Sequence, residues 1–439
     1  DVEEVAFPEN MTALNARQIF KNGAIKTLSI PSTMTVIGEY AFSSLSTLTT
    51  LTIAEGTADL TISGHAFDYD TALTSVAFPA RVTAISEYAF RDTSSMTSIT
   101  FAEGSRLTTI GQSAFESSAI AAITLPEGLT TIGQEAFKNT AFTEITIPDS
   151  ATALGWSLFN GNNSLTTVNI GDCVAELFVL KQDTSVFNGS NALTAIVAKS
   201  TNTKWFTNDG VLYQTAVNEE TGSNEITLAY YPRAKAGETF EIPANVNKIK
   251  NHAFKGVTAL TSVTFAADSK ISYIENNAFE KCTSLTAFNF PASVTYIGAY
   301  AFDGCSSLAA ITFEDGETPL VIGEKDTLYE NGEEGEGVKS TEYNYTFRDT
   351  ALVEVTLPAR LEYLGGMTFY GLTTLETVTF PEADSELTAI GNGAFNGVKN
   401  ATFVNLDKLN KLTLISNSAF IYVTSLQGIT LPDSVTMIG

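Results

Sequence analysis

The sequence is poor in basic side chains. Its 439 residues include 24 Lys plus Arg against 49 Asp plus Glu, which gives a formal net charge of −25. Nucleic acid and anionic lipid surfaces both recruit Lys and Arg, so this balance argues against either as a partner. No apolar run approaches the ~18 residues of a membrane-spanning helix. We therefore expect no nucleic-acid partner and no membrane insertion of this chain.

Only three cysteines are present, too few for a disulfide framework. Cys282 and Cys305 occupy equivalent places, each just before a Ser/Thr-Ser-Leu sequence, whereas Cys173 has no partner by position. Neighbouring strands lie ~4.8 Å apart, close to the Cα separation that a disulfide accepts. A bridge between Cys282 and Cys305 is therefore one interpretation. The other, which we favour, is a pair of small buried thiols.

The two histidines, His65 and His252, each precede an Ala-Phe pair, in a position that similar segments fill with Tyr, Ser or Glu. Such a permissive position predicts exposed, solvated imidazoles. The two lie far apart, whereas a metal site or a general base needs partners within bonding reach. The sequence also lacks a phosphate-binding glycine loop and a Gly-x-Ser-x-Gly elbow. We predict no catalytic residue, no metal, no cofactor and hence no enzyme.

What the sequence does contain is one pattern repeated about every 22 to 26 residues. In one copy, Leu73-x-x-Val76-x-Phe78-Pro79 is followed by Ile85 and then by Ala89-Phe90. A fixed period in this range predicts a solenoid, in which each unit buries its apolar face against its neighbours. The predicted fold is therefore an α/β solenoid, taken as right-handed, and not a closed globule.

Each copy contains a short alternating segment, such as Leu28-Ser29-Ile30 or Ile99-Thr100-Phe101. This period of two predicts one strand per copy, stacked into a single parallel sheet face. The Ala of Ala-Phe allows close backbone approach, and we expect its Phe to fill the interior and stack on the next Phe. The Gly-x-x-Ala-Phe stretch is short, so it predicts a single helical or 3-10 turn on the other side.

Two segments interrupt the pattern. The first, residues 199–243, contains Asp209-Gly210 between aromatic and β-branched residues, which predicts a small antiparallel hairpin insert within the array. The second, an acidic loop at about 314–345, carries Glu330, Glu333, Glu334 and Glu336 among glycines. The expected organisation is an N-terminal repeat block at 1–198, the insert at 199–243 and a C-terminal repeat block at 244–439.

The acidic loop offers oxygen ligands for Ca²⁺ at Glu314, Asp315, Glu317, Glu324 and Asp326. It lacks the alternating ligand pattern of a known calcium-binding loop. We interpret it as a solvated insertion.

The repeated phrase resembles the leucine-rich repeat of the BspA-like family. Ile123-Thr124-Leu125-Pro126 with Ile132-Gly133 and Ala136-Phe137 is a close copy, and the insert is similar to one that recurs in that family. The resemblance implies a leucine-rich-repeat solenoid and a secreted or cell-surface bacterial protein that binds host proteins or other cells. It transfers no binding residues, because the shared motif is a structural one.

Five aromatic residues outside the repeat pattern form the predicted ligand-binding site: Trp205, Phe206, Tyr213, Tyr230 and Tyr231. The competing interpretation is that they pack the insert against the array, because a small hairpin needs such packing. A second exposed aromatic set is Tyr40, Tyr88 and Tyr300.

The solvent face of the predicted sheet carries small hydroxyls, for example Thr50, Thr52 and Thr100. Thr favours strands and pairs with Thr across them, which accounts for this row without a ligand. The face is also poor in the Trp, Tyr and Arg residues that usually dominate binding energy.

The sequence thus predicts a non-enzymatic secreted or cell-surface protein that mediates protein–protein contact or cell adhesion, with an extracellular protein or glycan as ligand. Two alternatives stay open: a structural spacer that displays another domain, and the repeat region of a larger surface enzyme. Because the pattern is already under way at Val2 and still under way at Gly439, we expect a trimmed piece of a longer protein. Its export signal and anchor would then lie outside this sequence.

Overall fold

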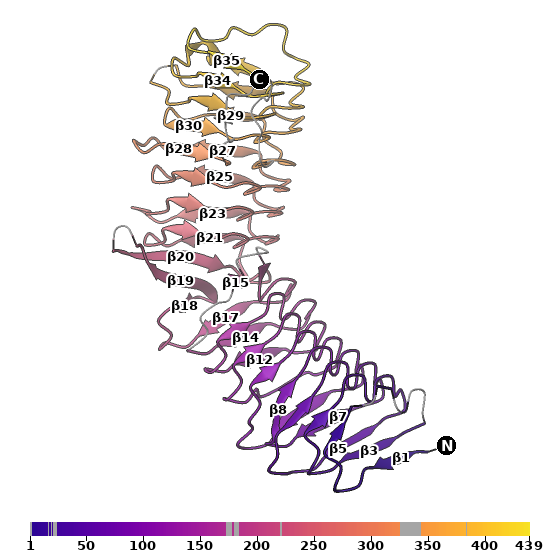
Figure 1. Ribbon diagram of the computed structural model, residues 1–439. Helices are drawn as coiled ribbons and strands as arrows, with labels where there is room; N and C mark the ends of the chain where they lie inside the picture. The colour runs from indigo at the N-terminus through magenta and orange to yellow at the C-terminus, as the bar shows by residue number, and fades with distance from the viewer. Residues whose placement is uncertain are drawn as a thin grey trace. The chain divides into compact units, whose positions relative to one another are not determined.

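A computed structural model describes the chain except for residues 1, 16, 19, 21–23, 173–177, 180–183, 220–221, 325–343 and 383. The chain forms two compact units, Asp1–Gly210 and Val211–Gly439, and each is a stack of coils (Figure 1). The border between them falls inside the segment predicted as an insert, 199–243. Most of the predicted acidic loop, as well as Cys173, lies outside the described residues. No helix in the described part is long and apolar enough to cross a membrane.

In the first unit, one set of strands carries the alternating apolar segments, and every pair within it is parallel and in register. The strands form three blocks: β1 (Glu4–Ala6), β3 (Thr27–Ile30) and β5 (Thr50–Ile53); β7 (Ser75–Phe78) and β9 (Ser98–Phe101); β12 (Glu144–Ile147), β14 (Thr167–Ile170) and β17 (Ala195–Ala198). The predicted parallel strands are therefore confirmed for this set.

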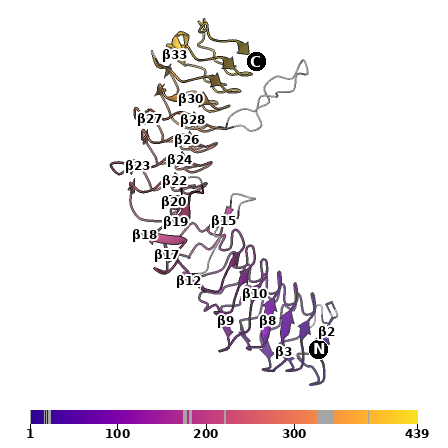
Figure 2. The same cartoon turned by 60° about the vertical axis from the view of Figure 1, so that its left-hand side comes forward.

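A second parallel sheet, which the sequence did not predict, runs through the same unit (Figure 2). It forms where the Val/Ile-Gly step of each copy is extended for two to four residues and pairs with the same step of its neighbours, as in Ile110↔Ile132. Its strands are β2 (Ala13–Leu14), β4 (Val36–Ile37), β6 (Leu60–Ile62), β8 (Val82–Ile85), β10 (Thr109–Ile110), β11 (Thr131–Ile132) and β13 (Ala153–Leu154). The prediction of a single sheet face was thus wrong. The remaining strands of this unit are β15 (Phe178–Val179), β16 (Thr184–Ser185) and β18 (Trp205–Asn208).

The second unit repeats the two-sheet arrangement. One sheet contains β21 (Thr239–Ile242), β23 (Ser262–Phe265), β25 (Ala287–Phe290), β27 (Ala310–Phe313), β29 (Glu354–Thr356), β31 (Thr377–Thr379) and β33 (Thr402–Val404). The other contains β19 (Val211–Val217), β20 (Asn224–Tyr230), β22 (Lys248–Ile249), β24 (Tyr273–Ile274), β26 (Tyr296–Ile297), β28 (Leu320–Ile322), β30 (Leu361–Leu364), β32 (Ala389–Ile390), β34 (Leu414–Ile415) and β35 (Met437–Ile438).

An antiparallel pair, β19 with β20, stands at the start of the second unit. β20 also pairs in parallel with β22, the first short strand of the coils that follow. A separate hairpin insert resting on the array is therefore not confirmed, because β20 is itself a strand of the coil sheet.

The Gly-x-x-Ala-Phe stretches form tight turns with a left-handed residue at each end, so the predicted helical turns are not confirmed. In one coil, φ is +57° at Tyr88 and +56° at Asp92, with Phe90 between them. The N–H groups of Tyr88, Phe90 and Asp92 each donate to the next coil, over 2.8 Å. A helix needs negative φ throughout and bonds within its own segment, and this backbone instead sends alternate N–H groups across to its neighbour. Within the described residues the one helical element is the 3-10 turn η1 (Leu406–Lys408).

The predicted phenylalanine stack is confirmed in both units. In the first unit, Phe90 lies 5.6 Å from Phe115, which lies 5.9 Å from Phe137. In the second, Phe254 lies 4.7 Å from Phe279 and the rings are nearly parallel. All of these side chains are buried, so the stack forms the core of each coil and extends from one coil to the next.

Two buried arginines brace coils that are not neighbours in the stack. Arg81 donates to the carbonyl of Ala54 in the adjacent coil (2.8 Å) and to that of Pro31 one coil further on (2.9 Å). In the second unit Arg360 does the same with Thr318 (3.3 Å) and Pro291 (3.2 Å). In each case the guanidinium supplies several donors that satisfy turn carbonyls in the interior.

Candidate functional site

Most of the aromatic residues proposed as a ligand site lie in the interior. Trp205, Tyr213, Tyr230 and Tyr231 are each at most 5% exposed, and Phe206 is half-buried. A buried ring cannot contact a macromolecule at the surface, so this placement favours the packing interpretation over ligand contact for the first four. Tyr231, for example, packs 5.0 Å from Phe254 of the phenylalanine stack.

The position before Ala-Phe holds a row of stacked rings in the first unit. His65 lies between Tyr40 and Tyr88, with ring centroids at 4.3 and 4.7 Å and nearly parallel planes. The expectation of an exposed, solvated His65 was wrong, because stacking of the coils places equivalent rings at van der Waals distance. Its Nδ1 also lies 2.7 Å from Asp68 Oδ2. His252 is likewise half-buried.

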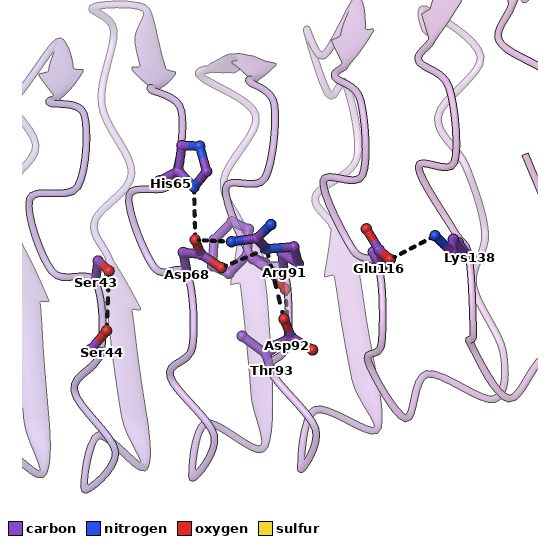
Figure 3. Close-up of polar contacts among 10 residues, drawn as sticks. Ser43, Ser44, His65, Asp68, Arg91, Asp92, Thr93, Glu116 and Lys138 are labelled. Atoms are coloured by element: carbon purple, nitrogen blue, oxygen red, sulfur yellow. Dashed lines mark hydrogen bonds and ion pairs between the residues drawn. The ribbon is translucent and has the colours of Figure 1, made fainter.

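The position after Ala-Phe holds charged residues that pair between neighbouring coils. Asp68 accepts two hydrogen bonds from Arg91, from Nε at 3.1 Å and from Nη2 at 2.8 Å (Figure 3). The Arg91 guanidinium also lies over Tyr69, 5.0 Å from the ring centroid, and over Tyr88, at 4.7 Å. Partial burial disfavours the charged form of Arg91, but the bonds to Asp68 outweigh this and raise the pKa of Arg91.

The next two coils continue the row of charges. Glu116 and Lys138 hold the same position as Asp68 and Arg91 and form an ion pair with a 3.1 Å N–O distance (Figure 3). Here no ring is stacked on the cation in the interactions that the structure records, which makes Lys138 a natural control for Arg91. We call the residues immediately before Ala-Phe and immediately after it, together with Tyr69, the aromatic-charged column.

The second unit contains the same arrangement. Arg348 donates to both carboxylate oxygens of Asp303 at 2.7 Å, and its guanidinium lies over Tyr345 at 4.5 Å and over Tyr300 at 5.8 Å. Tyr370 meets the edge of Tyr345 at 5.2 Å. In each unit the acid precedes the arginine by one coil, and both residues follow the stacked Phe.

Tyr40, Tyr88 and Tyr300 were predicted from the sequence as exposed aromatics, whereas the Asp–Arg pairs that hold this surface together were not predicted. The structure shows all three as half-buried. The available signal was the residue after Phe in consecutive copies, which reads Asp68 then Arg91, and Asp303 then Arg348.

This surface presents tyrosine rings and paired charges. Among the described residues, no group of three or more His, Cys, Asp or Glu side chains is placed to hold a metal ion. Of the residues considered for Ca²⁺, Glu314 contacts Asn289 and the backbone N–H of Ala292, while Asp326 lies outside the described part. Tyr and Arg side chains held in place by ion pairs suit contact with another protein.

A profile of the BspA type leucine rich repeat region matches six copies, at residues 1–60, 60–194, 226–323 and 341–439. Among solved structures, a leucine-rich repeat protein from Eubacterium ventriosum is similar at a TM-score of 0.54 and 21% identity, over 84% of this chain and 81% of that one. A leucine-rich cell surface protein from Faecalibacterium prausnitzii is similar at a TM-score of 0.50 and 21% identity, over 92% of this chain and 87% of that one.

At these identities the solved structures establish a shared fold. No curated protein matches the sequence. The matched copies, however, span most of the chain and contain the stacked Phe residues, the two sets of parallel strands and the aromatic-charged column. The chain therefore belongs to the BspA type leucine-rich repeat family.

Proposed function

We propose that this chain is a non-enzymatic, secreted or cell-surface protein that binds another protein, as an adhesin does with a host or matrix component. The observation that carries the proposal is the repetition of one surface arrangement, an Asp–Arg pair capped by tyrosines, at the same register in both units. The description of the Faecalibacterium prausnitzii relative as a cell surface protein supports the location.

The arrangement fits protein recognition for two physical reasons. The hydrogen bonds that Arg91 donates to Asp68 hold the guanidinium in place before a partner binds, so binding costs little side-chain entropy. Tyr69, 46% exposed, and Arg91 are also the residue types that dominate protein interfaces. The net charge of −25 further favours a partner with a basic surface.

The test is a binding assay with the immobilised chain and a panel of matrix proteins and glycans. The double variant Tyr69→Ala with Arg91→Ala is expected to weaken saturable binding at least tenfold. Lys138→Ala is the matched control, because it breaks an ion pair at the same register without removing a capped arginine. Equal weakening by the double variant and by Lys138→Ala would show that the tyrosine-capped arginine is not the site. Unchanged binding by both variants would show that the column is not the site. A panel with no saturable partner would favour the spacer.

The five aromatics at residues 205–231 remain a separate proposal. Only Phe206 among them keeps appreciable exposure, so we infer that any ligand contact by this set falls to Phe206. Phe206→Ala should then lower binding without lowering stability. Replacement of Trp205 or Tyr213 by Ala should instead destabilise the fold, since each leaves a cavity.

A further inference from the structure

One coil of the first unit leaves the sheet. Between β9 and β12 lies a complete coil whose expected strand, Ala121–Leu125, forms no strand. Among the hydrogen bonds that the structure records, residues 121–126 make no backbone bond to the coil on either side. The carbonyl of Ile120, just before this segment, accepts from the N–H of Ala141 in the next coil. The sheet is therefore open between β9 and the segment that follows it.

The opening forms a groove. Its volume is about 720 Å³, and its walls are Ser98–Ala102 with Gly104 and Ser105 on one side and Ala122–Gly128 on the other. Ser98 and Thr100 are exposed while Ile99 is buried, so the alternation of a normal strand is preserved along that wall. The groove has an apolar base and a rim of small hydroxyl and methyl groups.

The missing strand has a local cause. The segment combines two weak strand formers, Ala121 and Ala122, with Pro126, which has no N–H to donate at its end. The alanines alone are not sufficient, because Ala309-Ala310 precede Ile-Thr-Phe in β27, which pairs with β25 over four residues. In coils that do pair, the equivalent of Pro126 closes the ladder, as Ala102 does by donating to Phe78 over 3.0 Å. The segment Thr377-Val378-Thr379-Phe380-Pro381 shows that the proline alone is not sufficient, because it forms β31 and pairs with the preceding strand β29 over three residues.

The same feature occurs in the second unit. After β33, residues 427–431 form no strand, and a groove of about 510 Å³ lies between Ala401–Phe403 and Ser425–Thr430. Its open segment is Gln427-Gly428 followed by Ile-Thr-Leu-Pro, and the first is Ala121-Ala122 followed by Ile-Thr-Leu-Pro. The same Ile-Thr-Leu-Pro sequence, preceded by two residues that are neither β-branched nor aromatic, thus accompanies an open sheet twice.

We propose that the groove between β9 and Ala122–Gly128 binds an extended peptide segment of a partner protein, which completes the interrupted sheet by strand addition. In the paired coils, alternate residues of each strand turn their N–H and C=O groups toward the next coil. By this register Ile99 and Phe101 present theirs to the groove, as Ala122 and Thr124 do from the other wall. Main-chain bonds of this kind give affinity, and alternate side chains give specificity.

The chemistry of the groove defines the peptide. Every second residue must be apolar and β-branched or leucine-like, because it points inward between Ile99 and Ile123, which line the two walls. The outward residues must be small. Glu127 lines one end of the groove, and Glu103 is exposed nearby. These carboxylates favour a basic residue after the extended stretch, in line with the negative charge of the chain.

This inference rests on the proposed binding function, and its test uses a defined probe that needs no matrix partner. The probe is a fluorescein-labelled peptide, Thr-Thr-Leu-Thr-Ile-Ala-Lys-Lys, whose first six residues copy 49–54 of the chain. Fluorescence anisotropy with the whole chain should give saturable binding. N-methylation of the Leu and Ile amides removes two donors and should weaken it at least tenfold. Replacing both lysines with Glu should weaken it as well.

Hydrogen exchange locates the site. The peptide should slow exchange at the amides of Ile99, Phe101, Ala122 and Thr124 and leave those of β14 unchanged. The variant Ala121→Thr with Ala122→Val should close the ladder, protect these amides without peptide and abolish binding. Retained circular dichroism and unchanged exchange in β14 would show that the variant is folded.

Three results would overturn the proposal. The N-methylated peptide binds as well as the parent, the closing variant binds unchanged, or the peptide protects other amides only. Self-association of the free chain with protection of these four amides would assign the groove to a second copy and so also overturn it. Any of these leaves the wider binding function in place, with the aromatic-charged column as its site.

Discussion

The two units share one backbone pattern but fill one inner position with different chemistry. The position lies three residues after the stacked Phe and is buried throughout. Apart from Leu45, the first unit fills it with polar residues, namely Asp70, Thr93, Ser118, Thr140, Asn162 and Ser190. Apart from Thr350, the second unit fills it with apolar residues or cysteine, namely Val257, Cys282, Cys305, Leu372, Val398 and Val423.

The polar set is tolerated because the turn supplies a partner. Thr93, Ser118 and Thr140 each donate to the carbonyl of the Phe three residues earlier, over 2.8 to 3.0 Å. In the second unit Cys282 and Cys305 donate their thiols to a Phe carbonyl of the preceding coil, which agrees with the interpretation as buried free thiols. The repeat thus fixes a hydrogen-bond acceptor in the interior, and a buried polar group is acceptable where it reaches that acceptor.

The largest expected effect tests what the units have in common. Phe115→Ala in the first unit and Phe369→Ala in the second each remove a ring from a continuous stack. Each should cost about 3 to 5 kcal/mol, since the cavity cannot collapse fully. Segment-resolved hydrogen exchange should show the loss confined to the unit that carries the change. A large difference between the units would mean that the inner position, and not the stack, controls their stability.

A smaller loss is expected on removal of the buried arginines. Arg81→Ala and Arg360→Ala each leave several interior carbonyls without a donor, at about 1 to 3 kcal/mol for an unsatisfied group. Arg81→Ala should lose more stability in denaturant titration, because Arg81 donates from Nε to Ala54 whereas the buried Nε of Arg360 has no acceptor among the described residues. Arg81→Lys should recover only part of the loss, since an ammonium group cannot span the same carbonyls. Full recovery by lysine would contradict the bracing role.

Asp70 is the one carboxyl among the inner positions named for both units, so it should respond to pH in the acidic to neutral range, where none of the inner side chains named for the second unit titrates. Burial raises the pKa of this carboxyl, and the nearby Asp68 adds to the effect, while the bond from the Leu45 N–H opposes it. A raised native pKa means that the folded state holds its proton more tightly. The contribution to stability is then complete below the unfolded pKa of ~3.9 and is lost as pH rises through the native pKa.

Asp70→Asn removes this loss of stability, because an amide does not ionise. An amide also fits this position, since Asn162 fills the equivalent one and accepts from the N–H of Thr140 as Asp70 does from that of Leu45. The variant should be more stable than the parent at pH 7.5, where folding must otherwise keep the Asp70 carboxyl protonated or bury its charge. Near pH 4 the two should be much closer. Denaturant titrations at both pH values decide the matter, and an advantage independent of pH would refute the assignment to ionisation.

The smallest effect on stability is expected when a polar inner residue of the first unit is made apolar and an apolar one of the second unit is made polar. Thr93→Val should cost about 1 kcal/mol, the net value of a buried hydrogen bond. Val398→Thr should cost no more than that, because its hydroxyl can donate to the carbonyl of Phe395 as Thr93 does to Phe90. Thermal unfolding of both variants measures the exchange. A cost of several kcal/mol for Val398→Thr would show that the second unit lacks the acceptor.

Features that recur in every copy of the repeat could be predicted from the sequence. Contacts between side chains of two different copies could not. Ala-Phe recurs in each copy, so the buried stack at Phe90 and Phe115 followed directly. The Asp68–Arg91 pair was missed because its members lie 23 residues apart and meet only when the coils are in register. The open strand at Ala121–Leu125 was missed because its Ile-Thr-Leu-Pro sequence fits the pattern. Neither the alanines before it nor the proline after it predicts an open strand alone, since β27 forms after Ala309-Ala310 and β31 forms before Pro381.

The left-handed backbone at the turns limits which residue types can precede Ala-Phe, although that position accepts side chains of very different polarity. The position before Ala-Phe accepts Tyr, His, Ser, Glu, Asn and Met, yet no Val, Ile or Thr has positive φ anywhere in the described part of the chain. β-Branched side chains clash with that backbone. Substitution at these positions is therefore limited by the shape of the side chain at Cβ and hardly at all by its polarity. Substitutions can therefore place new charges and aromatic rings at this edge of the coil at little cost in folding free energy. Such substitutions give the protein new partners while the interior stays unchanged.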